Sequence, residues 1–201
     1  MKRYNGLHVE DLSNTTKPLE LLLALQVNAF YYNIDNAIYI MAGILLPPTF
    51  NKAWPNSMKF GTMGFILGHE LTHAFNTIGA QYDETGNRRY WWTQKSIKVF
   101  KKRSNCYVKH YEQYLIPEIK RNINGENTKD ENIADAGGLR TALMAYRRFI
   151  KNKTKNSESL TTIYKDEQMP GLDLSPEQLF FLSFAQLFCS AYKEADYWKE
   201  L

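Results

Sequence analysis

Residues 64–76 of this 201-residue chain read GFILGHELTHAFN, and this stretch decides the fold class. Its apolar residues recur at helical spacing, which predicts a helix over residues 61–77. On such a helix His69 and His73 stand one turn apart on one face, so both imidazoles can reach one ion. Zinc suits two imidazoles and a carboxylate, so the stretch predicts a zinc site whose third ligand lies elsewhere.

Glu70 gives this pattern a chemical meaning. It lies about 100° round the helix from His69, beside an ion rather than on it. There it could accept a proton from water as the water attacks a carbonyl. The alternative is a chance match, because the HExxH spacing also occurs in unrelated helices. Two histidines buried in an apolar helix need partners of some kind, and this favours a metal.

The best candidate for the third ligand lies in DENIADAGGL, residues 130–139. Glu131 and Asp135 are four apart and share one helix face. If Glu131 binds zinc, Asp135 could accept the second ring proton of a zinc histidine and fix its orientation. The alternative is an acidic first turn that is stabilised by the helix dipole. That alternative does not explain Asp135 or the two following glycines, which indicate close packing against a neighbour.

The rest of the chain predicts one small sheet among helices. Residues 26–46 form two β-prone runs around an Asn/Asp cluster at 33–36, which indicates a hairpin. Pro47-Pro48 should end its second strand. Further helices are expected at residues 93–116, 130–150 and 175–192, with loops at 79–92, 122–128 and 151–174. The predicted fold class is therefore α+β and mostly helical, and no linker divides the chain into independent domains.

Composition indicates a packed globular protein, with 44% hydrophobic and 14% aromatic residues. The net charge is only +4. The densest basic run, residues 98–103, lies in a helical pattern and is interpreted as a solvated helix face, so no nucleic-acid partner is expected. Two cysteines are too few for a disulfide framework.

The sequence shows no transmembrane segment and no signal peptide, because its apolar runs are short and residues 2–17 are largely polar. Two glycosylation tripeptides, at Asn14 and Asn152, are nevertheless typical of exported proteins.

Six motifs together resemble the neprilysin family of zinc endopeptidases, in order and spacing and over nearly the whole chain. They are VNAFY (27–31), AGILLPP (42–48), GFILGHELTH (64–73), YWWTQ (90–94), ENIADAGGL (131–139) and PGLDLSPEQLFFLSFAQLFC (170–189). The resemblance implies a thermolysin-like zincin catalytic subdomain of a much longer ectoenzyme. Such an enzyme would be secreted or anchored at the cell surface by parts of the parent protein not present here, and would act on peptides.

The resemblance also implies roles for the central residues. His69, His73 and Glu131 match the ligands of one zinc ion. Glu70 matches the general base, and Asp135 matches the acid that orients a zinc histidine.

A substrate-binding set follows from the same resemblance. Asn28 and Ala29 match strand residues that hold the substrate backbone, and an edge strand can pair with an extended peptide. Without the resemblance Asn28 would be interpreted as an exposed polar strand residue. The pocket for the residue after the scissile bond would be lined by apolar positions, which favours cleavage on the amino side of hydrophobic residues. These positions are Ile44, Phe65, Ile66, Leu187 and Phe188. Each of them could equally be an ordinary core residue.

The resemblance breaks off at the end of the chain. The family continues beyond Leu201 with a histidine and an arginine that act on the substrate, and it begins with a large helical domain and a membrane anchor. In the family, the positions of Cys106 and Cys189 pair with cysteines outside this sequence. Residues 1–201 are therefore expected to be one partial peptidase domain. It would be either a zinc metallopeptidase or a catalytically impaired remnant that binds peptides or proteins.

Overall fold

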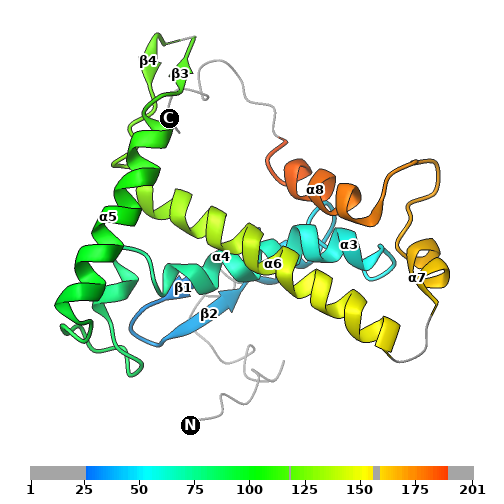
Figure 1. Ribbon diagram of the computed structural model, residues 1–201, viewed down its shortest axis with the longest axis horizontal. Helices are drawn as coiled ribbons and strands as arrows, with labels where there is room; N and C mark the ends of the chain where they lie inside the picture. Colours follow the sequence, from blue (N-terminus) through cyan, green and yellow to red (C-terminus); the bar gives the residue numbers. More distant parts are fainter. Residues whose placement is uncertain (1–25, 118, 156–158, 190–201) are drawn as a thin grey trace, which may run out of the picture.

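The computed structural model describes residues 26–117, 119–155 and 159–189, and helices dominate it (Figure 1). The four strands in these residues are β1 (Ala29–Tyr32), β2 (Ala37–Ile40), β3 (Leu115–Ile116) and β4 (Arg121–Asn122). The α-helices are α3 (Asn56–Lys59), α4 (Phe65–His73), α5 (Gln94–Tyr111), α6 (Lys129–Lys155), α7 (Leu160–Asp166) and α8 (Pro176–Gln186). The prediction of a mostly helical α+β fold is confirmed.

The expected hairpin is present, because β1 pairs antiparallel with β2 and Ala29 faces Ile40. Its second strand is shorter than predicted. Residues 42–45 form a 3-10 turn in which the N–H of Ile44 donates to the carbonyl of Met41 at 3.2 Å. Within the described residues, the sheet has only the strands β1 and β2. The apolar residues 42–45 therefore leave it, and their turn buries Ile44.

The tip of the hairpin rests on the loop at residues 83–89. Asn36 has a left-handed backbone, with φ of 47°, and its amide donates to the carbonyl of Glu84 at 3.2 Å. Gly86 lies so close that a Cβ there would stand 1.7 Å from the carbonyl oxygen of Ile34. The same loop is held together by Asp83, which accepts three hydrogen bonds from Thr85 and Asn87.

The helix that carries the HExxH motif begins earlier and ends earlier than predicted. A π-helical turn at Phe60–Gly64 joins α3 to α4, so the helical run starts at Asn56 and ends at His73. The helix stops because the side-chain oxygen of Asn76 accepts the N–H groups of Ile78 and Gly79, at 3.0 and 2.8 Å. These bonds turn the chain instead of continuing the helix to residue 77.

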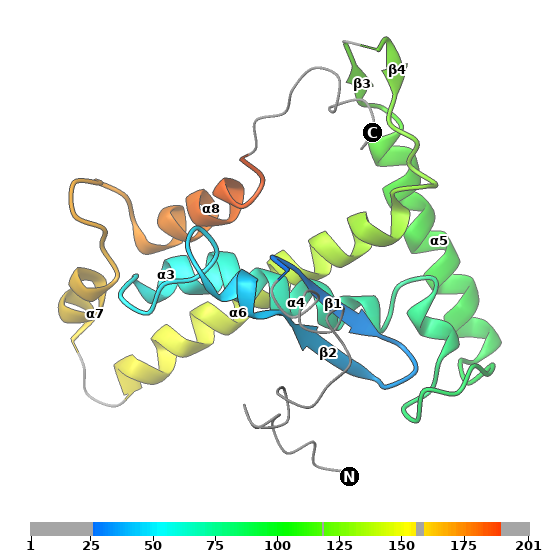
Figure 2. The same cartoon turned by 180° about the vertical axis from the view of Figure 1, so that it is seen from behind.

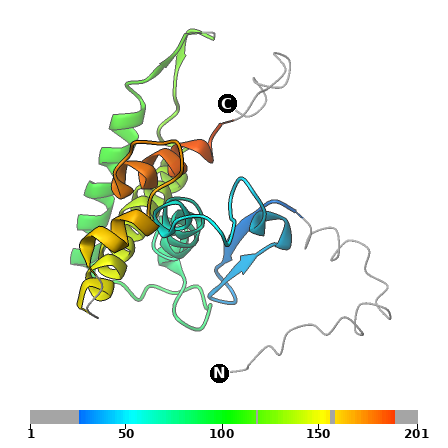
Figure 3. The ribbon, with the colours of Figure 1, turned by 90° about the vertical axis from the view of Figure 1, so that its right-hand side faces the viewer.

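Helix α4 lies between the hairpin and α6, as Figure 3 shows with α4 seen nearly end on. The backbones of α4 and α6 touch where Gly68 meets Gly138, and a Cβ on Gly68 would be 2.8 Å from the carbonyl of Gly138. The close packing predicted from the glycine pair on α6 is confirmed. Beyond this crossing the buried core consists of Phe65, Ala142, Tyr146 and Phe180.

Other boundaries also differ from prediction. Helix α5 ends at Tyr111, and part of its expected last turn pairs instead as β3 with β4. The predicted loop 151–174 holds the end of α6 and all of α7, which Ser159 caps by accepting the N–H of Thr162. Figure 2 shows α7 beside the far end of α6. The capping box of α8 at Ser175 is confirmed. That helix ends at Gln186, and the expected residues 190–192 lie outside the described residues.

Candidate active site

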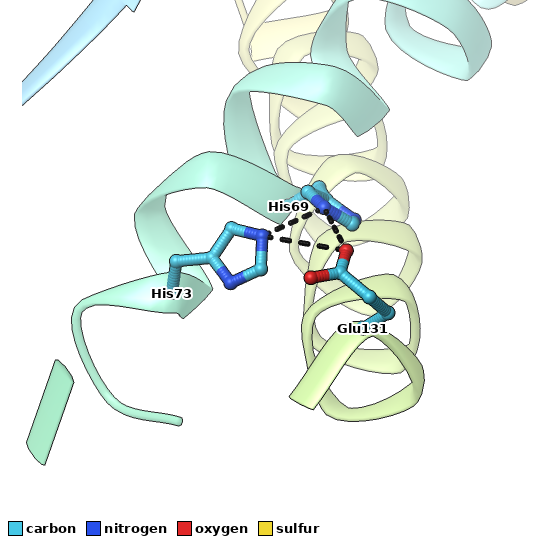
Figure 4. A group of neighbouring side chains, drawn as sticks. All are labelled: His69, His73 and Glu131. Atoms are coloured by element: carbon cyan, nitrogen blue, oxygen red, sulfur yellow. Dashed lines mark hydrogen bonds and ion pairs between the residues drawn. The ribbon is translucent and has the colours of Figure 1, made fainter. Parts of the chain in front are cut away.

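Three predicted metal ligands meet where α4 crosses the beginning of α6 (Figure 4). The Nε2 atoms of His69 and His73 lie 2.9 Å apart. Oε2 of Glu131 is 3.3 Å from Nε2 of His69 and 3.6 Å from Nε2 of His73. All three donor atoms thus converge on one point, and two imidazoles with a carboxylate are a donor set that fits zinc.

Asp135 holds the ring of His69 from the other side. Its Oδ1 lies 2.8 Å from Nδ1 of His69, so Nε2 is the nitrogen that faces His73 and Glu131. Burial alone lowers the pKa of His69, but its hydrogen bonds to Asp135 and Glu131 outweigh burial and raise that pKa to about 9. The hydrogen bond to His69 in turn lowers the pKa of Glu131. The acidic face of α6 therefore both orients and polarises this imidazole.

His73 is held by Asn76, a residue that sequence reasoning missed. The side-chain amide nitrogen of Asn76 lies 2.9 Å from Nδ1 of His73, and Asn76 is buried. Burial lowers the pKa of His73, against the opposing charge of Glu131. The i, i+3 spacing of the two residues was the available signal, but it is informative only if the helical path continues as far as Asn76.

Glu70 is buried, with 6% of its surface exposed, and lines the same cavity as the two histidines. Burial raises its pKa, while the charge of His69 and a hydrogen bond from the backbone of Tyr31 oppose that rise. A carboxylate with a raised pKa is a better proton acceptor at neutral pH. Strand β1 therefore contacts the candidate base through its main chain.

The cavity at this site has a volume of about 390 Å³. Ala29 and Tyr31 of strand β1, with Asn28 just before it, form one wall, and α4 with the start of α6 forms the opposite wall. The structure thus brings Asn28 and Ala29 to the same cavity as the three metal-binding candidates and Glu70. The side-chain oxygen of Asn28 accepts the N–H of Ala29 at 2.9 Å.

The five predicted pocket residues lie elsewhere, and none lines this cavity. The ring of Phe65 is in the core, 5.8 Å from that of His69, and the 57%-exposed Phe188 packs against it at 5.9 Å. Ile66 and Leu187 pack partly buried against the same core, while Ile44 is buried in the turn after β2. Their role in substrate recognition stays a prediction.

The segment after α4 is tied to the start of α6 beside the cavity. Oδ1 of Asp130 accepts the N–H of Thr77 at 2.8 Å and its hydroxyl at 2.7 Å. This links the segment after α4 to the residue before Glu131. Nothing in the sequence pattern indicated Thr77, because the contact depends on how the chain turns after His73.

Two further predictions concern membrane spans and cysteines. Within residues 26–117, 119–155 and 159–189, every helix is either too short or too polar to span a lipid bilayer. Cys106 and Cys189 are both exposed and form no disulfide within the same residues.

Comparison with known proteins agrees with this geometry. Residues 28–201 match the model of peptidase family M13. An endothelin-converting enzyme homolog from Locusta migratoria is 44% identical over 82% of this chain, and membrane metallo-endopeptidase-like 1 from Homo sapiens is 42% identical over 87%. The chain spans 21% of each of these relatives.

Solved structures give the same result. The crystal structure of a zinc metalloprotease from Mycobacterium tuberculosis, in complex with an inhibitor, aligns with a TM-score of 0.68 and 32% identity. The alignment covers 80% of this chain and 23% of that one. The zincin-like fold predicted from the sequence is therefore confirmed, and the chain belongs to peptidase family M13.

Proposed function

We propose that this chain carries the catalytic centre of a zinc-dependent metalloendopeptidase that hydrolyses peptides on the amino side of hydrophobic residues. One observation carries the proposal. The buried carboxylate of Glu70 shares a cavity with the converging His69, His73 and Glu131, next to a strand that can receive a peptide. Because the chain spans about a fifth of its relatives, the activity of the whole protein is part of the proposal.

His69, His73 and Glu131 would hold one zinc ion. Zinc bound there would supply Lewis acidity toward a carbonyl group and lower the pKa of water. Asp135 keeps Nε2 of His69 directed at the ion position through its hydrogen bond to Nδ1. Asn76 likewise holds the ring of His73, through its contact with Nδ1.

Glu70 acts as the general base. It accepts a proton from the water that attacks the scissile carbonyl and then passes it to the leaving amine. Its burial favours this exchange, because desolvation brings the pKa of the carboxyl closer to neutral pH.

Strand β1 aligns the substrate. It pairs only with β2 among the described residues. The N–H of Ala29 is bonded to its neighbour Asn28 and the backbone of Tyr31 to Glu70, so an extended peptide would pair with this edge by replacing these bonds. Ala29 lies in the wall of the cavity, and the Asn28 side chain can both donate to and accept from a peptide backbone. The apolar set around Phe65 would favour a hydrophobic residue after the scissile bond. Peptides outside the cell are the proposed substrates, in keeping with a secreted or cell-surface parent protein.

The test separates metal binding from cleavage. Zinc content is measured by atomic absorption after dialysis, and cleavage is measured with a fluorogenic peptide that has phenylalanine after the scissile bond. Glu70→Gln should keep about one zinc per chain and lose cleavage by about three orders of magnitude or more, whereas His73→Ala should lose both. Cleavage retained by Glu70→Gln would refute the proposed base. No zinc in the unsubstituted chain would refute the metal centre.

A further inference from the structure

We propose that Asn76 opposes zinc binding at His73 and holds the zinc affinity of the site below the value that the three ligands could otherwise reach. This role rests on the proposed metal centre and deepens it, because it gives one residue control over how tightly the ion is held. It follows from the direction of one hydrogen bond, between the side-chain amide nitrogen of Asn76 and Nδ1 of His73, which lie 2.9 Å apart.

The backbone fixes the orientation of the Asn76 amide. Its Oδ1 accepts the N–H groups of Ile78 and Gly79, at 3.0 and 2.8 Å. A backbone N–H can only donate, so the atom that faces these two groups must be the amide oxygen. The atom that faces His73 is therefore the NH2 group, which also can only donate. Nδ1 of His73 accepts this hydrogen bond and so carries no hydrogen of its own.

Zinc binding requires the opposite arrangement at His73. Nε2 is the nitrogen that lies near His69 and Glu131, while Nδ1 points away from them (Figure 4). A neutral imidazole that binds an ion through Nε2 carries its one ring hydrogen on Nδ1. This N–H would face the NH2 group of Asn76, so two donors would meet where a hydrogen bond needs a donor and an acceptor.

His69 has the partner that His73 lacks. Nδ1 of His69 faces Oδ1 of Asp135 at 2.8 Å, and an ionised carboxylate can only accept. Metal-binding histidines ordinarily donate their second ring N–H to a carboxylate, a carbonyl oxygen or water. Among the described residues, the only hydrogen-bond partner of Nδ1 of His73 is the Asn76 amide. The two imidazoles are therefore unequally prepared for an ion.

The Asn76 amide can adapt to zinc only by losing other hydrogen bonds. Turning it over would bring Oδ1 to His73, but the NH2 group would then face the N–H groups of Ile78 and Gly79. Asn76 and Gly79 are both buried, so a lost acceptor there is costly. The turn is too tight for the backbone to move aside, because a Cβ on Gly79 would stand 1.9 Å from the carbonyl oxygen of His73.

Asn76→Asp tests the direction of this hydrogen bond. A carboxylate of the same shape accepts the N–H groups of Ile78 and Gly79 with one oxygen and the N–H at Nδ1 of His73 with the other. Zinc affinity, measured by competition with a chromogenic chelator, should therefore rise by about 10- to 100-fold. An unchanged or lower zinc affinity would overturn the proposal.

Asn132→Asp is the matched control for the added charge. Asn132 is buried next to Glu131 in the chain, and its amide donates to the hydroxyl oxygen of Thr128 at 2.8 Å instead of contacting a histidine. The hydroxyl can rotate and donate to the new carboxylate, so the fold should survive. This change should raise zinc affinity much less than Asn76→Asp. An equal rise would mean that charge alone sets the affinity, and the proposal would fail.

Hydrogen exchange at two backbone amides gives a readout that depends on neither affinity nor cleavage. In the unsubstituted chain zinc should turn the Asn76 amide over, so the N–H groups of Ile78 and Gly79 should exchange faster by about tenfold or more. A ligand that stabilises the fold slows exchange elsewhere, so faster exchange at these two positions has a local cause. In Asn76→Asp both positions should stay protected. Protection that zinc leaves unchanged in the unsubstituted chain would contradict the proposal.

These measurements separate the role of Asn76 from the metal centre itself. If the unsubstituted chain and Asn76→Asp bind zinc with equal affinity, the role of Asn76 is wrong and the metal centre stands. If neither binds zinc, the metal centre is wrong, and the role of Asn76 is wrong with it.

Discussion

Asp135 accepts the ring proton of His69 across the gap between two helices, with 2.8 Å between Oδ1 and Nδ1. The imidazole comes from α4 and the carboxylate from α6, one turn after Glu131. The orientation of a candidate zinc ligand is therefore set by the helix that also provides the third ligand.

This contact makes Asp135→Asn a sensitive substitution. An amide of the same shape keeps the packing but loses the charge that polarises His69. Zinc affinity should fall by about 10- to 100-fold, as measured by competition with a chromogenic chelator. Asp173→Asn removes an exposed carboxylate that does not line the cavity and should change nothing. Unchanged zinc affinity in Asp135→Asn would show that Asp135 does not position His69.

Gly138→Ala should disturb the site through the backbone. A Cβ at this position would stand 2.6 Å from the main-chain nitrogen of His69, so the two helices must separate. We expect a loss of about 1–3 kcal/mol in unfolding free energy, measured in urea, together with weaker zinc binding.

Gly64→Ala is the matched control, because its Cβ would meet nothing closer than the Phe60 side chain at 3.4 Å and the carbonyl oxygen of Lys59 at 3.7 Å, which are ordinary contacts. If Gly64→Ala and Gly138→Ala behaved alike, the helix contact would not be the cause.

Gly86→Ala should affect the substrate and not the metal. The new Cβ would collide with the carbonyl of Ile34 and push the hairpin tip, and with it strand β1, away from Glu70. Peptide kcat/KM should fall by on the order of 10- to 100-fold, as expected for a displacement of about 1 Å, while zinc content is unchanged.

Gly171→Ala separates this contact from backbone strain. Gly171 has φ of 80°, close to the 79° of Gly86, but nothing lies within 4 Å of its Cβ position. Gly171→Ala should cost about 1–2 kcal/mol of stability without any change in kcat/KM. A similar fall in kcat/KM for both alanine variants would show that contact with the hairpin tip is not the cause.

The link between α6 and α8 should make stability depend on pH. Nε and Nη2 of Arg147 donate to the two carboxylate oxygens of Glu177, at 2.7 and 2.8 Å, and these hydrogen bonds lower the pKa of Glu177. A carboxyl with a lowered pKa in the folded state contributes stability above its ordinary pKa, and this contribution disappears as the pH falls through the lowered value.

Glu177→Gln should therefore lower the melting temperature at pH 7 and have no effect at pH 2. Calorimetry at the two pH values measures the difference. An equal effect at both pH values would mean that the place of Glu177 in the first turn of α8, and not its ion pair with Arg147, stabilises the helix.

Sequence reasoning succeeded where the information is local. The helical period alone puts His69 and His73 on one face and Glu70 beside them, and the same period puts Glu131 next to Asp135. That the two pairs belong to one site came from the resemblance, because the residues alone left an acidic first turn as an equal alternative.

It failed where the chain changes direction. Asn76 and Asp130 hold the segment that follows α4, and both act through contacts with backbone N–H groups that no spacing predicts. Helix α7 was missed because residues 151–174 are mostly polar, and Ile163 is fully buried only through contacts made in the folded chain.

The meeting of α4 and α6 at the site has a thermodynamic consequence. His73 and Glu131 are joined by all the residues from Ala74 to Asp130, so an ion held between them would cross-link two ends of a long loop. An unfolded chain offers no such arrangement, and the free energy of metal binding would therefore become free energy of folding. Stability would then rise with the logarithm of the free metal concentration. The metal supply around the protein would control how much of it is folded as well as how much of it is active.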